Sequence, residues 1–303
     1  MKKEFYSNGK LLMTGEYAVL DGAIAWAIPT KYGQSLTVLE TESKKIEWTS
    51  LDEKGSIWFE TDYKLESMTG ISSSNSEIST TLLEILIEAQ KLNPSFLTNG
   101  LGYAIETKLT FPRDWGLGSS STLINNIAQW ANVNPYQLLK NTFRGSGYDI
   151  ACAQYNTPIL YQLVNGKPRI EEVLNFNPDF KDQLFFIYLN RKQNSRDGIS
   201  QYRQLKFNTN LLVRTIGEIT TQMCSCTDLF TFKTLMDQHE QLISRTLKMP
   251  TIKKTLFQDY PGAIKSLGAW GGDFVLATGD KSSMAYFKQK GYSIIIPYSE
   301  MTL

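Results

Sequence analysis

The stretch FPRDWGLGSSSTLINNIAQW, residues 111–130, joins a strand-like run to a helix-like run through two glycines and three serines. Glycine at such a junction costs chain entropy, so a structural or functional reason is expected. Glycines let backbone N–H groups turn toward an anion, and a helix N-terminus adds about half a positive charge. We therefore predict a phosphate-binding loop from Gly116 to Ser121, with an ordinary turn capped by serine as the alternative. It is not a Walker A loop, because no Gly-Lys-Ser/Thr closes it.

Length and charge limit the classes of protein to consider. The chain has 303 residues and a formal net charge of +1, enough for one large domain or two of ordinary size. The balanced charge gives no reason to expect nucleic acid or an anionic membrane as a partner. No run of about eighteen apolar residues occurs, so no membrane span is expected.

Cysteine and histidine usage narrows the chemistry. Cys152, Cys224 and Cys226 form no paired CxxC spacing, and an odd number argues against a disulfide framework. This usage fits a reducing cytosol, and we expect a cytoplasmic location. The single histidine, His239, lies in a polar helix-like stretch, where a surface or packing role is expected. Chemistry is then left to aspartate, lysine, serine and the backbone.

The apolar periodicity predicts a mixed α and β chain. Residues 34–61 alternate β-branched and aromatic side chains, which is typical of consecutive strands. Residues 72–94 change to a helical period, and Ser74 and Glu77 have the spacing of a capping box. Asn134 is the expected cap of a short helix with proline at its first position.

A second α+β pattern begins in the later part of the chain. Asn165 and Gly166 predict the turn of a hairpin. Residues 182–190 have a buried-strand pattern and are followed by two long helical patterns, a strand, a helix and a strand, so the boundary is expected near residues 175–182. We therefore place a domain boundary between residues 178 and 179.

Three further segments accompany the glycine loop. Residues 9–16 hold Gly-Lys and Gly-Glu pairs, residues 268–272 read Gly-Ala-Trp-Gly-Gly, and residues 147–151 read Gly-Tyr-Asp-Ile-Ala. Residues 9–16, Pro112 through Ser120 and residues 268–272, in this order along the chain, resemble the motifs of the GHMP kinases, named for galactokinase, homoserine kinase, mevalonate kinase and phosphomevalonate kinase. The GYDIA stretch is similar to one branch of that family.

The resemblance implies a fold and an activity. The fold is α+β with two domains: residues 1–178 like domain 2 of ribosomal protein S5, which binds ATP, and residues 179–303 ferredoxin-like. The activity is that of an ATP-dependent, Mg²⁺-using kinase of the isoprenoid precursor pathway. It would phosphorylate a small-molecule acceptor, for which mevalonate or phosphomevalonate is the best candidate. A homodimer is left open.

Two residues are candidates for catalysis. Phosphoryl transfer needs a group that orients the acceptor hydroxyl and takes its proton, and Asp149 in GYDIA is the candidate. The alternative is an N-cap for the helix that begins there. Lys10 is the candidate cation that stabilises the phosphoryl group and keeps Asp149 ionised. Its alternative is a solvated lysine.

The remaining candidate residues bind ligands. The nucleotide phosphates are assigned to Gly116, Leu117, Gly118, Ser119, Ser120 and Ser121, and Ser120 is also the candidate Mg²⁺ ligand. The acceptor is assigned to Glu16, Tyr17, Lys192, Arg196, Gly271 and Gly272. The alternatives are a structural hydrogen bond for Glu16, solvation for the two cations and an ordinary turn for the glycines. Gly-Glu-Tyr is more like phosphomevalonate kinases than mevalonate kinases.

The sequence also departs from the family pattern. Mevalonate kinases usually have a glutamate upstream of the catalytic aspartate that helps to hold Mg²⁺, whereas residues 135–143 contain no acidic residue. Trp270 and Asp273 stand where the family often has small residues, which puts close backbone approach in doubt. The missing glutamate keeps open a nucleotide-binding protein with little catalysis. A mevalonate-diphosphate decarboxylase also stays open, because such enzymes share the glycine loop and consume ATP.

Overall fold

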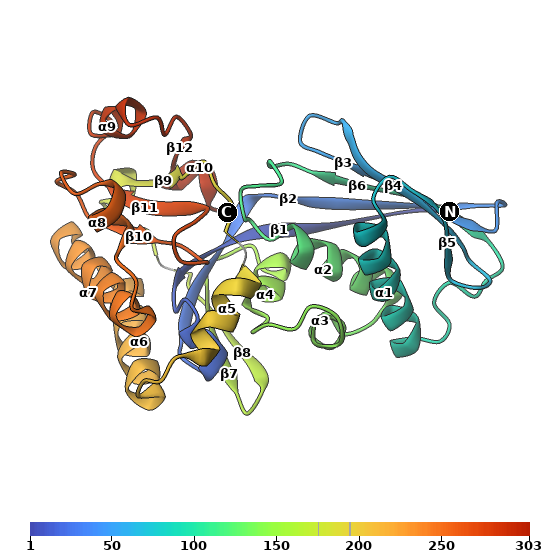
Figure 1. Ribbon diagram of the computed structural model, residues 1–303, viewed down its shortest axis with the longest axis horizontal. Helices are drawn as coiled ribbons and strands as arrows, with labels where there is room; N and C mark the ends of the chain where they lie inside the picture. Colours follow the sequence, from blue (N-terminus) through green and yellow to red (C-terminus); the bar gives the residue numbers. More distant parts are fainter. Residues whose placement is uncertain (175, 194) are drawn as a thin grey trace. The chain divides into compact units, whose positions relative to one another are not determined.

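The computed structural model describes residues 1–174, 176–193 and 195–303, and these divide into two compact units. Neither unit is a single stretch of sequence, as can be followed in Figure 1, where the colours run along the chain from the N-terminus to the C-terminus. Unit 1 contains Met1–Gly9, Tyr32–Arg113 and Leu117–Gln154; unit 2 contains Lys10–Lys31, Asp114–Gly116 and Tyr155–Leu303. The domain boundary between residues 178 and 179 stays a prediction, because units of packing and domains of sequence need not coincide.

Unit 1 is a sheet covered on one face by helices. The strands lie in the order β5-β4-β3-β6-β2, in which β3 and β6 are parallel and the other neighbours antiparallel. Their bounds are β5 Thr69–Ser73, β4 Ile57–Lys64, β3 Lys45–Leu51, β6 Gly102–Leu109 and β2 Ala25–Thr41; β1, Lys2–Thr14, pairs with β2. Alternate residues of β3 are buried, as a sheet with one covered face requires.

The helices of unit 1 are α1 Ser76–Leu92, α2 Ser119–Ala131, α3 Pro135–Asn141 and α4 Tyr148–Gln154. The expected cap at Asn134 is confirmed, since its side chain accepts hydrogen bonds from the N–H groups of Tyr136 and Gln137. The predicted capping box of α1 is wrong by one residue. Asn75 is the cap, because the backbone and side chain of Ser74 are still bonded to Glu60 on β4.

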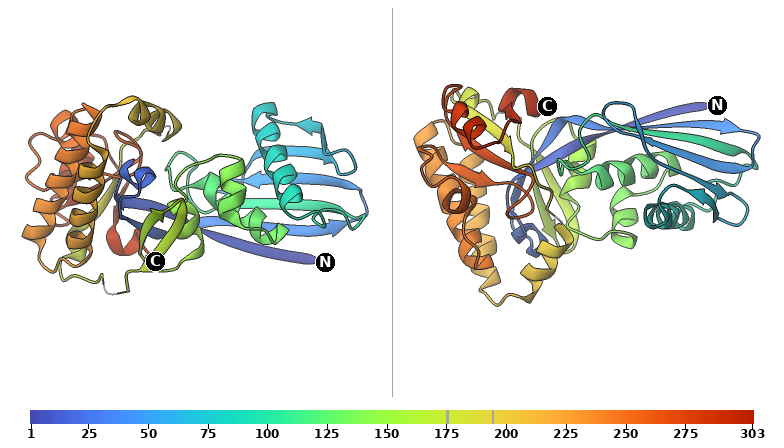
Figure 2. Two further views of the ribbon diagram at one scale, coloured as in Figure 1. Left: turned by 90° about the horizontal axis from the view of Figure 1, so that it is seen from below. Right: turned by 45° about the horizontal axis from the view of Figure 1, so that its top comes forward.

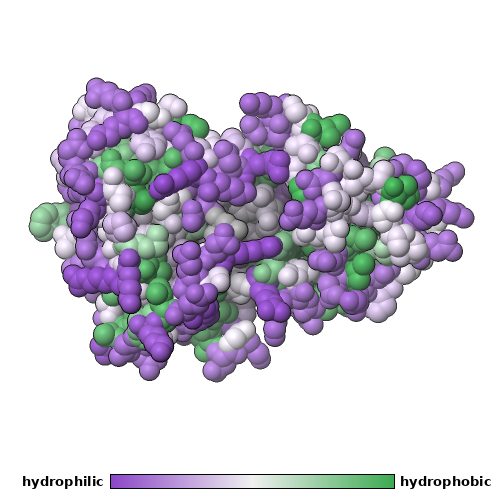
Figure 3. Space-filling view, viewed as in Figure 1, coloured by the Kyte–Doolittle hydropathy of each residue, from purple (hydrophilic) through white to green (hydrophobic). Residues whose placement is uncertain are grey.

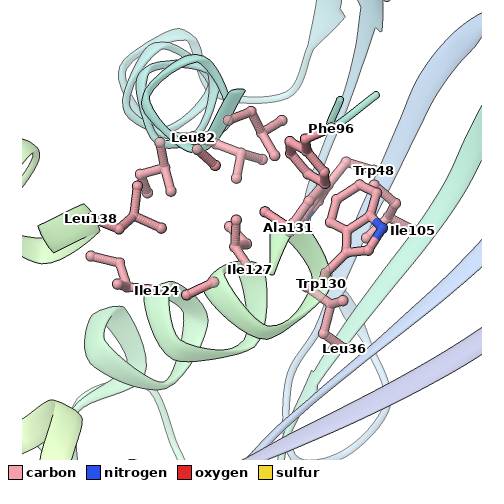
Figure 4. Packing of buried hydrophobic residues seen from close by; sticks show 14 of the residues in the cluster. Leu36, Trp48, Leu82, Phe96, Ile105, Ile124, Ile127, Trp130, Ala131 and Leu138 are labelled. Atoms are coloured by element: carbon pink, nitrogen blue, oxygen red, sulfur yellow. The ribbon is translucent and has the colours of Figure 1, made fainter. Parts of the chain in front are cut away.

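The core of unit 1 lies between the helices and the sheet, as Figure 4 shows. Leu82 of α1 and Ile127 of α2 approach Trp48 and Ile105 of the strands. Trp130 packs edge-on against Phe96, with ring centroids 4.7 Å apart. Each fully buried side chain of this size contributes about 1.5–3 kcal/mol relative to exposure. This packing fixes α2, the helix that follows the glycine loop.

Unit 2 contains an antiparallel sheet in the order β10-β11-β9-β12. The bounds are β10 Ile264–Ser266, β11 Phe274–Thr278, β9 Leu184–Tyr188 and β12 Ile295–Pro297. Every residue of β9 is buried, which confirms the predicted buried strand. The hairpin at Asn165 and Gly166 is confirmed too, between β7 Ile159–Val164 and β8 Lys167–Glu172. Residues 25–27 of β2 pair with β7.

Helices complete unit 2. The long helices α6 and α7 lie side by side, as both views of Figure 2 show. The helical elements are η1 Ala18–Asp21, η2 Lys181–Gln183, α5 Ser195–Gln204, α6 Thr209–Cys224, α7 Leu229–Leu247, α8 Ile252–Leu256, α9 Met284–Gln289 and α10 Tyr298–Met301. Both units mix helices with sheet, so the α+β class is confirmed.

The molecular surface is mostly hydrophilic in the view of Figure 3. In the face that Figure 3 shows, hydrophobic residues form small separate patches among hydrophilic ones. Of the helices that the structure describes, none combines the length and the hydropathy needed to cross a membrane.

Candidate active site

The glycine loop leaves the start of α2 without a side-chain cap. Gly118 occupies the cap position with φ 89°, and no side chain there accepts from the first N–H groups of the helix. The Ser121 hydroxyl is turned away from them, since it donates to the Gly118 carbonyl at 2.8 Å. The first N–H groups of a helix need acceptors, and an anion supplies them. The geometry therefore favours the anion-binding interpretation over a serine-capped turn, and Ser120 is exposed there.

Buried amides hold α2 in place. Asn126 donates to the Gln34 carbonyl at 2.9 Å, and Asn125 donates to the Ser7 hydroxyl at 2.8 Å. The Ser7 hydroxyl in turn donates to Asn126 Oδ1. All these groups are buried and bonded, so the network resists rotation of the helix.

Asp149 lies in the first turn of α4, in unit 1. Gly147 precedes it with φ 88°, and the carboxylate accepts from the Ile150 N–H at 3.1 Å. Gln154 at the end of α4 donates to Asn125 Oδ1 at 2.9 Å, which ties α4 to α2. Asp149 is half-buried at the start of α4. Its position is set by the glycine two residues before it and by the packing of α4 on α2.

Lys10 and Gly116 meet in unit 2. The Lys10 ammonium donates to the Gly116 carbonyl at 2.8 Å, across 106 positions of sequence. Lys10 is half-buried near the end of β1 and not a fully solvated lysine. The predicted cation and the first glycine of the loop are therefore neighbours in the fold.

Asp273 lies against the same glycine. A β-carbon on Gly116, whose φ is 66°, would lie 2.0 Å from Oδ2 of Asp273. The other carboxylate oxygen accepts from the Gln193 N–H at 3.1 Å. Burial raises the pKa of Asp273, and the Gln193 N–H and the charges of Lys10 and Lys192 oppose that rise. The residue that departs from the family pattern is thus in close contact with the loop.

Tyr17, predicted to bind the acceptor, is held by two parts of unit 2: the segment that contains Trp270, and α5. Its hydroxyl accepts from the Trp270 N–H at 2.9 Å. Its ring stacks on Tyr202 of α5 at a centroid distance of 5.4 Å. A β-carbon on Gly198 would lie 2.6 Å from the Tyr17 hydroxyl, so only glycine lets α5 approach this closely.

Gly271 and Gly272 lie beside the loop that follows β9. A β-carbon on Gly272 would be 2.2 Å from that of Gln193, and the Asp273 N–H donates to the Arg191 carbonyl at 3.0 Å. Lys192 follows in this loop and is exposed, as is Arg196 in α5. Unit 2 thus brings together several of the residues predicted to bind the acceptor, although the roles themselves stay predictions.

A buried ionic cluster, which sequence reasoning missed, lies behind Tyr17. Glu16 is 0% exposed, and its carboxylate accepts from Lys265 of β10, also 0% exposed. Glu240 of α7 accepts from the Ser266 N–H at 2.8 Å. The burial of Glu16 favours the structural hydrogen bond that was its alternative role. The residues next to Lys265 in the sequence, Ile264 and Ser266, gave no signal that this lysine is buried.

His239 joins this cluster from α7. It is fully buried, so the expected packing role fits better than a surface one. Its Nε2 accepts from the Gly15 N–H at 3.0 Å, and burial lowers its pKa well below 6.5. The ring is therefore neutral, and the Glu16 oxygen 3.2 Å from Nε2 contacts a neutral group.

Burial also shifts the pKa values of the two buried acids of this cluster, Glu16 and Glu240. It raises the pKa of Glu16 against the opposing charge of Lys265, and it raises the pKa of Glu240 to about 8. Glu240 is then mostly protonated near neutral pH, whereas Glu16 has the strongly bonded lysine as its counter-ion. The cluster is close to neutral overall, as burial demands.

Metal donors are sparse. Among residues 1–174, 176–193 and 195–303, no group of three or more histidine, cysteine, aspartate and glutamate side chains could hold a metal ion. The charge of Asp114 adds a small contribution to the raised pKa of Asp273, which is due mainly to burial, so these two carboxylates of unit 2 are within electrostatic reach of each other. Asp114 accepts from the Tyr188 hydroxyl at 2.8 Å.

This architecture is found in solved structures of small-molecule kinases. Methanococcus jannaschii mevalonate kinase is 17% identical, with a TM-score of 0.71 over 98% of this chain and 97% of that chain. Streptococcus pneumoniae phosphomevalonate kinase, in complex with phosphomevalonate and AMPPNP, is 17% identical, with a TM-score of 0.70 over 97% and 99%. Lactococcus lactis galactokinase, complexed with galactose, is 14% identical, with a TM-score of 0.68 over 95% and 88%.

The chain has the GHMP kinase fold. The sequence matches no protein-family model and no curated protein. The predicted resemblance is therefore confirmed at the level of the fold, over nearly the whole chain. Within the GHMP kinase fold, identities of 14–17% leave the substrate open.

Proposed function

We propose that the protein is an ATP-dependent kinase that transfers the terminal phosphate of ATP to a small-molecule acceptor. The observation that carries this proposal is the start of α2, which has a glycine cap, no side-chain acceptor for its first N–H groups, and an exposed Ser120. The contact between Lys10 and the Gly116 carbonyl supports it, because it brings a cation to the first residue of the loop.

The residues of the chain would divide the chemistry between them. The N–H groups from Gly116 to Ser121 would bind the nucleotide phosphates, and Lys10 would stabilise negative charge on the transferring group. Asp149 would orient the acceptor hydroxyl and take its proton. If the acceptor is already a phosphate, Asp149 would not need to remove a proton, and positioning would dominate.

Mg²⁺ would neutralise charge on the phosphates when bound. It takes one or two carboxylates together with water and nucleotide phosphates. Asp114 and Asp273 supply oxygens of that kind beside Gly116, so the donors of unit 2 fit the ion. Ser120 remains the predicted hydroxyl ligand.

For the acceptor we propose mevalonate or phosphomevalonate. Structural neighbours include a phosphomevalonate kinase in complex with phosphomevalonate and a mevalonate kinase in complex with R-mevalonate. Cations at Lys192 and Arg196, on and after the loop that contacts Gly271 and Gly272, favour an anionic acceptor.

The test is ADP release from Mg-ATP with mevalonate, phosphomevalonate, mevalonate diphosphate, homoserine and galactose. Each reaction is paired with Asp149→Asn and with Asp62→Asn, a control on β4. We expect acceptor-dependent ADP from the wild type and from the control only, with ATP binding intact in all three. Release of CO₂ from mevalonate diphosphate would establish a decarboxylase instead. ATP binding without turnover on any acceptor would contradict the proposal and favour a nucleotide-binding protein.

A further inference from the structure

A lysine that the proposed chemistry does not use is completely buried in unit 2. Lys265 is 0% exposed on β10, and its ammonium donates to the Glu16 carboxylate and, at 2.8 Å, to the Ser266 carbonyl. Buried ion pairs seldom stabilise a protein more than apolar residues of the same size would. A role in stability alone therefore does not account for a lysine at this position.

The partner of Lys265 adjoins a residue with a costly backbone conformation. Tyr17, directly after Glu16, has φ 57° and ψ −44°, which a bulky side chain rarely adopts. Such conformations persist only where the surroundings over-determine them, and they cluster at functional sites. Here the residues before Tyr17 are fixed from two sides, since His239 accepts from the Gly15 N–H while Lys265 holds Glu16.

The same lysine adjoins the segment that contacts the Tyr17 side chain. Lys265 belongs to β10, and the chain continues from this strand directly into residues 268–272. Within that segment the Trp270 N–H donates to the Tyr17 hydroxyl at 2.9 Å. One bond from Lys265 and one from Trp270 therefore join the segment that contains Glu16 to the segment that contains Gly271 and Gly272.

We infer that Lys265 is a positioning residue for the acceptor: by holding Glu16, it fixes Tyr17 against residues 268–272. This inference rests on the proposed kinase function and on the predicted assignment of Tyr17, Gly271 and Gly272 to the acceptor. Lys265 is itself fully buried, so it would act through Glu16 and Tyr17 and not by contact with a substrate. Lys265 would affect acceptor binding by fixing the position of Tyr17, which is predicted to contact the acceptor.

The chemistry of the Tyr17 hydroxyl shows why its placement matters. The oxygen accepts from Trp270, so the hydroxyl hydrogen remains available to donate. Among the described residues, the structure gives this hydrogen no acceptor. Burial raises the pKa of Tyr17, so the hydroxyl keeps its proton at neutral pH. An oxygen of the acceptor would complete this bond only while Tyr17 keeps its position.

The test compares three variants. Lys265→Met alone leaves Glu16 as a buried charge without its counter-ion, so the variant Lys265→Met/Glu16→Gln removes both charges and leaves neither one buried and unpaired. Lys253→Met is the matched control, since Lys253 also donates to a backbone carbonyl, that of Gly262, at 2.7 Å. For the double variant we expect the acceptor KM to rise about tenfold or more, while the KM for ATP changes less than about threefold. Lys253→Met should leave both unchanged.

Hydrogen exchange gives a readout that needs no substrate. Peptides that cover residues 13–18 and 268–272 should lose protection together in the double variant, whereas a peptide from α1 should not. The control should keep the wild-type pattern throughout. This measurement separates the two proposals, because it applies even if the wild type phosphorylates none of the acceptors.

Two results would overturn the inference. One is a folded double variant that keeps the acceptor KM of the wild type, which would make Lys265 merely structural. The other is unchanged protection of residues 13–18 and 268–272, which would show that the pair does not hold Tyr17. Absence of turnover in the wild type would contradict the proposed kinase, and exchange alone would then decide the role of Lys265.

Discussion

The carboxylate of Asp273 lies so close to Gly116 that a β-carbon on the glycine would be 2.0 Å from Oδ2. Asp273, which directly follows the Gly-Ala-Trp-Gly-Gly segment, therefore restricts the residue type at the start of the glycine loop, far away in the sequence. Position 116 requires glycine for two reasons: its φ is 66°, and Asp273 occupies the space that a side chain would need. The proposed active site depends on this contact for the start of its phosphate loop.

Gly116→Ala should destabilise the protein through both of these effects. Gly100→Ala is the control, because Gly100 also has a positive φ, 77°, but a β-carbon there would meet nothing within 4 Å. Backbone strain should cost each variant about 1–2 kcal/mol, and the clash should add about 1–3 kcal/mol to Gly116→Ala only. Denaturant unfolding measures the difference. Adding Asp273→Gly to Gly116→Ala should recover the second contribution, and no recovery would mean that the contact is not the cause.

Replacing Lys10 should impair catalysis more than folding. Lys10→Met removes the cation that donates to the Gly116 carbonyl, and we expect kcat to fall about 100-fold or more, as for loss of other electrostatic contacts in active sites. Lys3→Met, on the exposed part of the same strand, should be neutral. Steady-state kinetics with titration calorimetry of ATP binding would check this. Equal activity of the two variants would show that Lys10 has no part in transfer.

Glu240 should make stability depend on pH. Burial raises its pKa from the usual 4.5 to about 8, so the folded state keeps a proton that the unfolded chain releases. Stability from this group is therefore fully present below about pH 4.5 and declines as the pH rises toward about 8, by up to about 1.4 kcal/mol per pH unit. His239, with its lowered pKa, acts in the opposite sense below about pH 6.5.

The window between about pH 6.8 and 7.8 isolates Glu240 from His239. Urea unfolding of the wild type should lose stability across this window relative to Glu240→Gln, which carries no titrating proton. Parallel curves for the two proteins would show that Glu240 is already ionised in the folded state.

Truncation in the core of unit 1 should be costly. Ile127 of α2 is fully buried among residues of α1 and the sheet, and Ile127→Ala should cost about 2–5 kcal/mol. Ile57→Ala on β4, where the side chain is 59% exposed, should cost less than about 0.5 kcal/mol. Thermal and denaturant unfolding would compare them. A similar loss for both would contradict the placement of Ile127 in the core.

Local sequence signals predicted much of the fold. The helical period of residues 72–94, the all-apolar run of β9 and the Asn165-Gly166 turn each depend on neighbours in the chain, and all three are confirmed. The cap of α1 was missed by one residue because serine and asparagine are both good caps. Asn75 is the cap because Ser74 is hydrogen-bonded to Glu60 on β4, and this contact with a strand cannot be seen in the local sequence.

The site was predictable only in part, for the same reason. Glycines and short motifs marked the loop, but nothing local distinguishes Lys265, which is buried, from the solvated lysines around it. Its burial follows from Glu16, 249 positions away. Likewise, the sequence showed Asp273 only as a residue that departs from the family motif. The fold shows that its carboxylate occupies the space that the missing side chain of Gly116 leaves open.

Unit 2 is assembled from separate stretches of the chain, and this affects how it can fold during synthesis on the ribosome. Lys10–Lys31 is made among the first residues of the chain but belongs with Tyr155–Leu303, whereas the last residue of unit 1 is Gln154. Unit 1 can thus complete its core while Lys10–Lys31 still lacks the rest of unit 2. Glu16 must remain hydrated until Lys265 emerges, because an unpaired charge is costly to bury. Nascent chains that stop before β10 should therefore be substrates for chaperones or proteases.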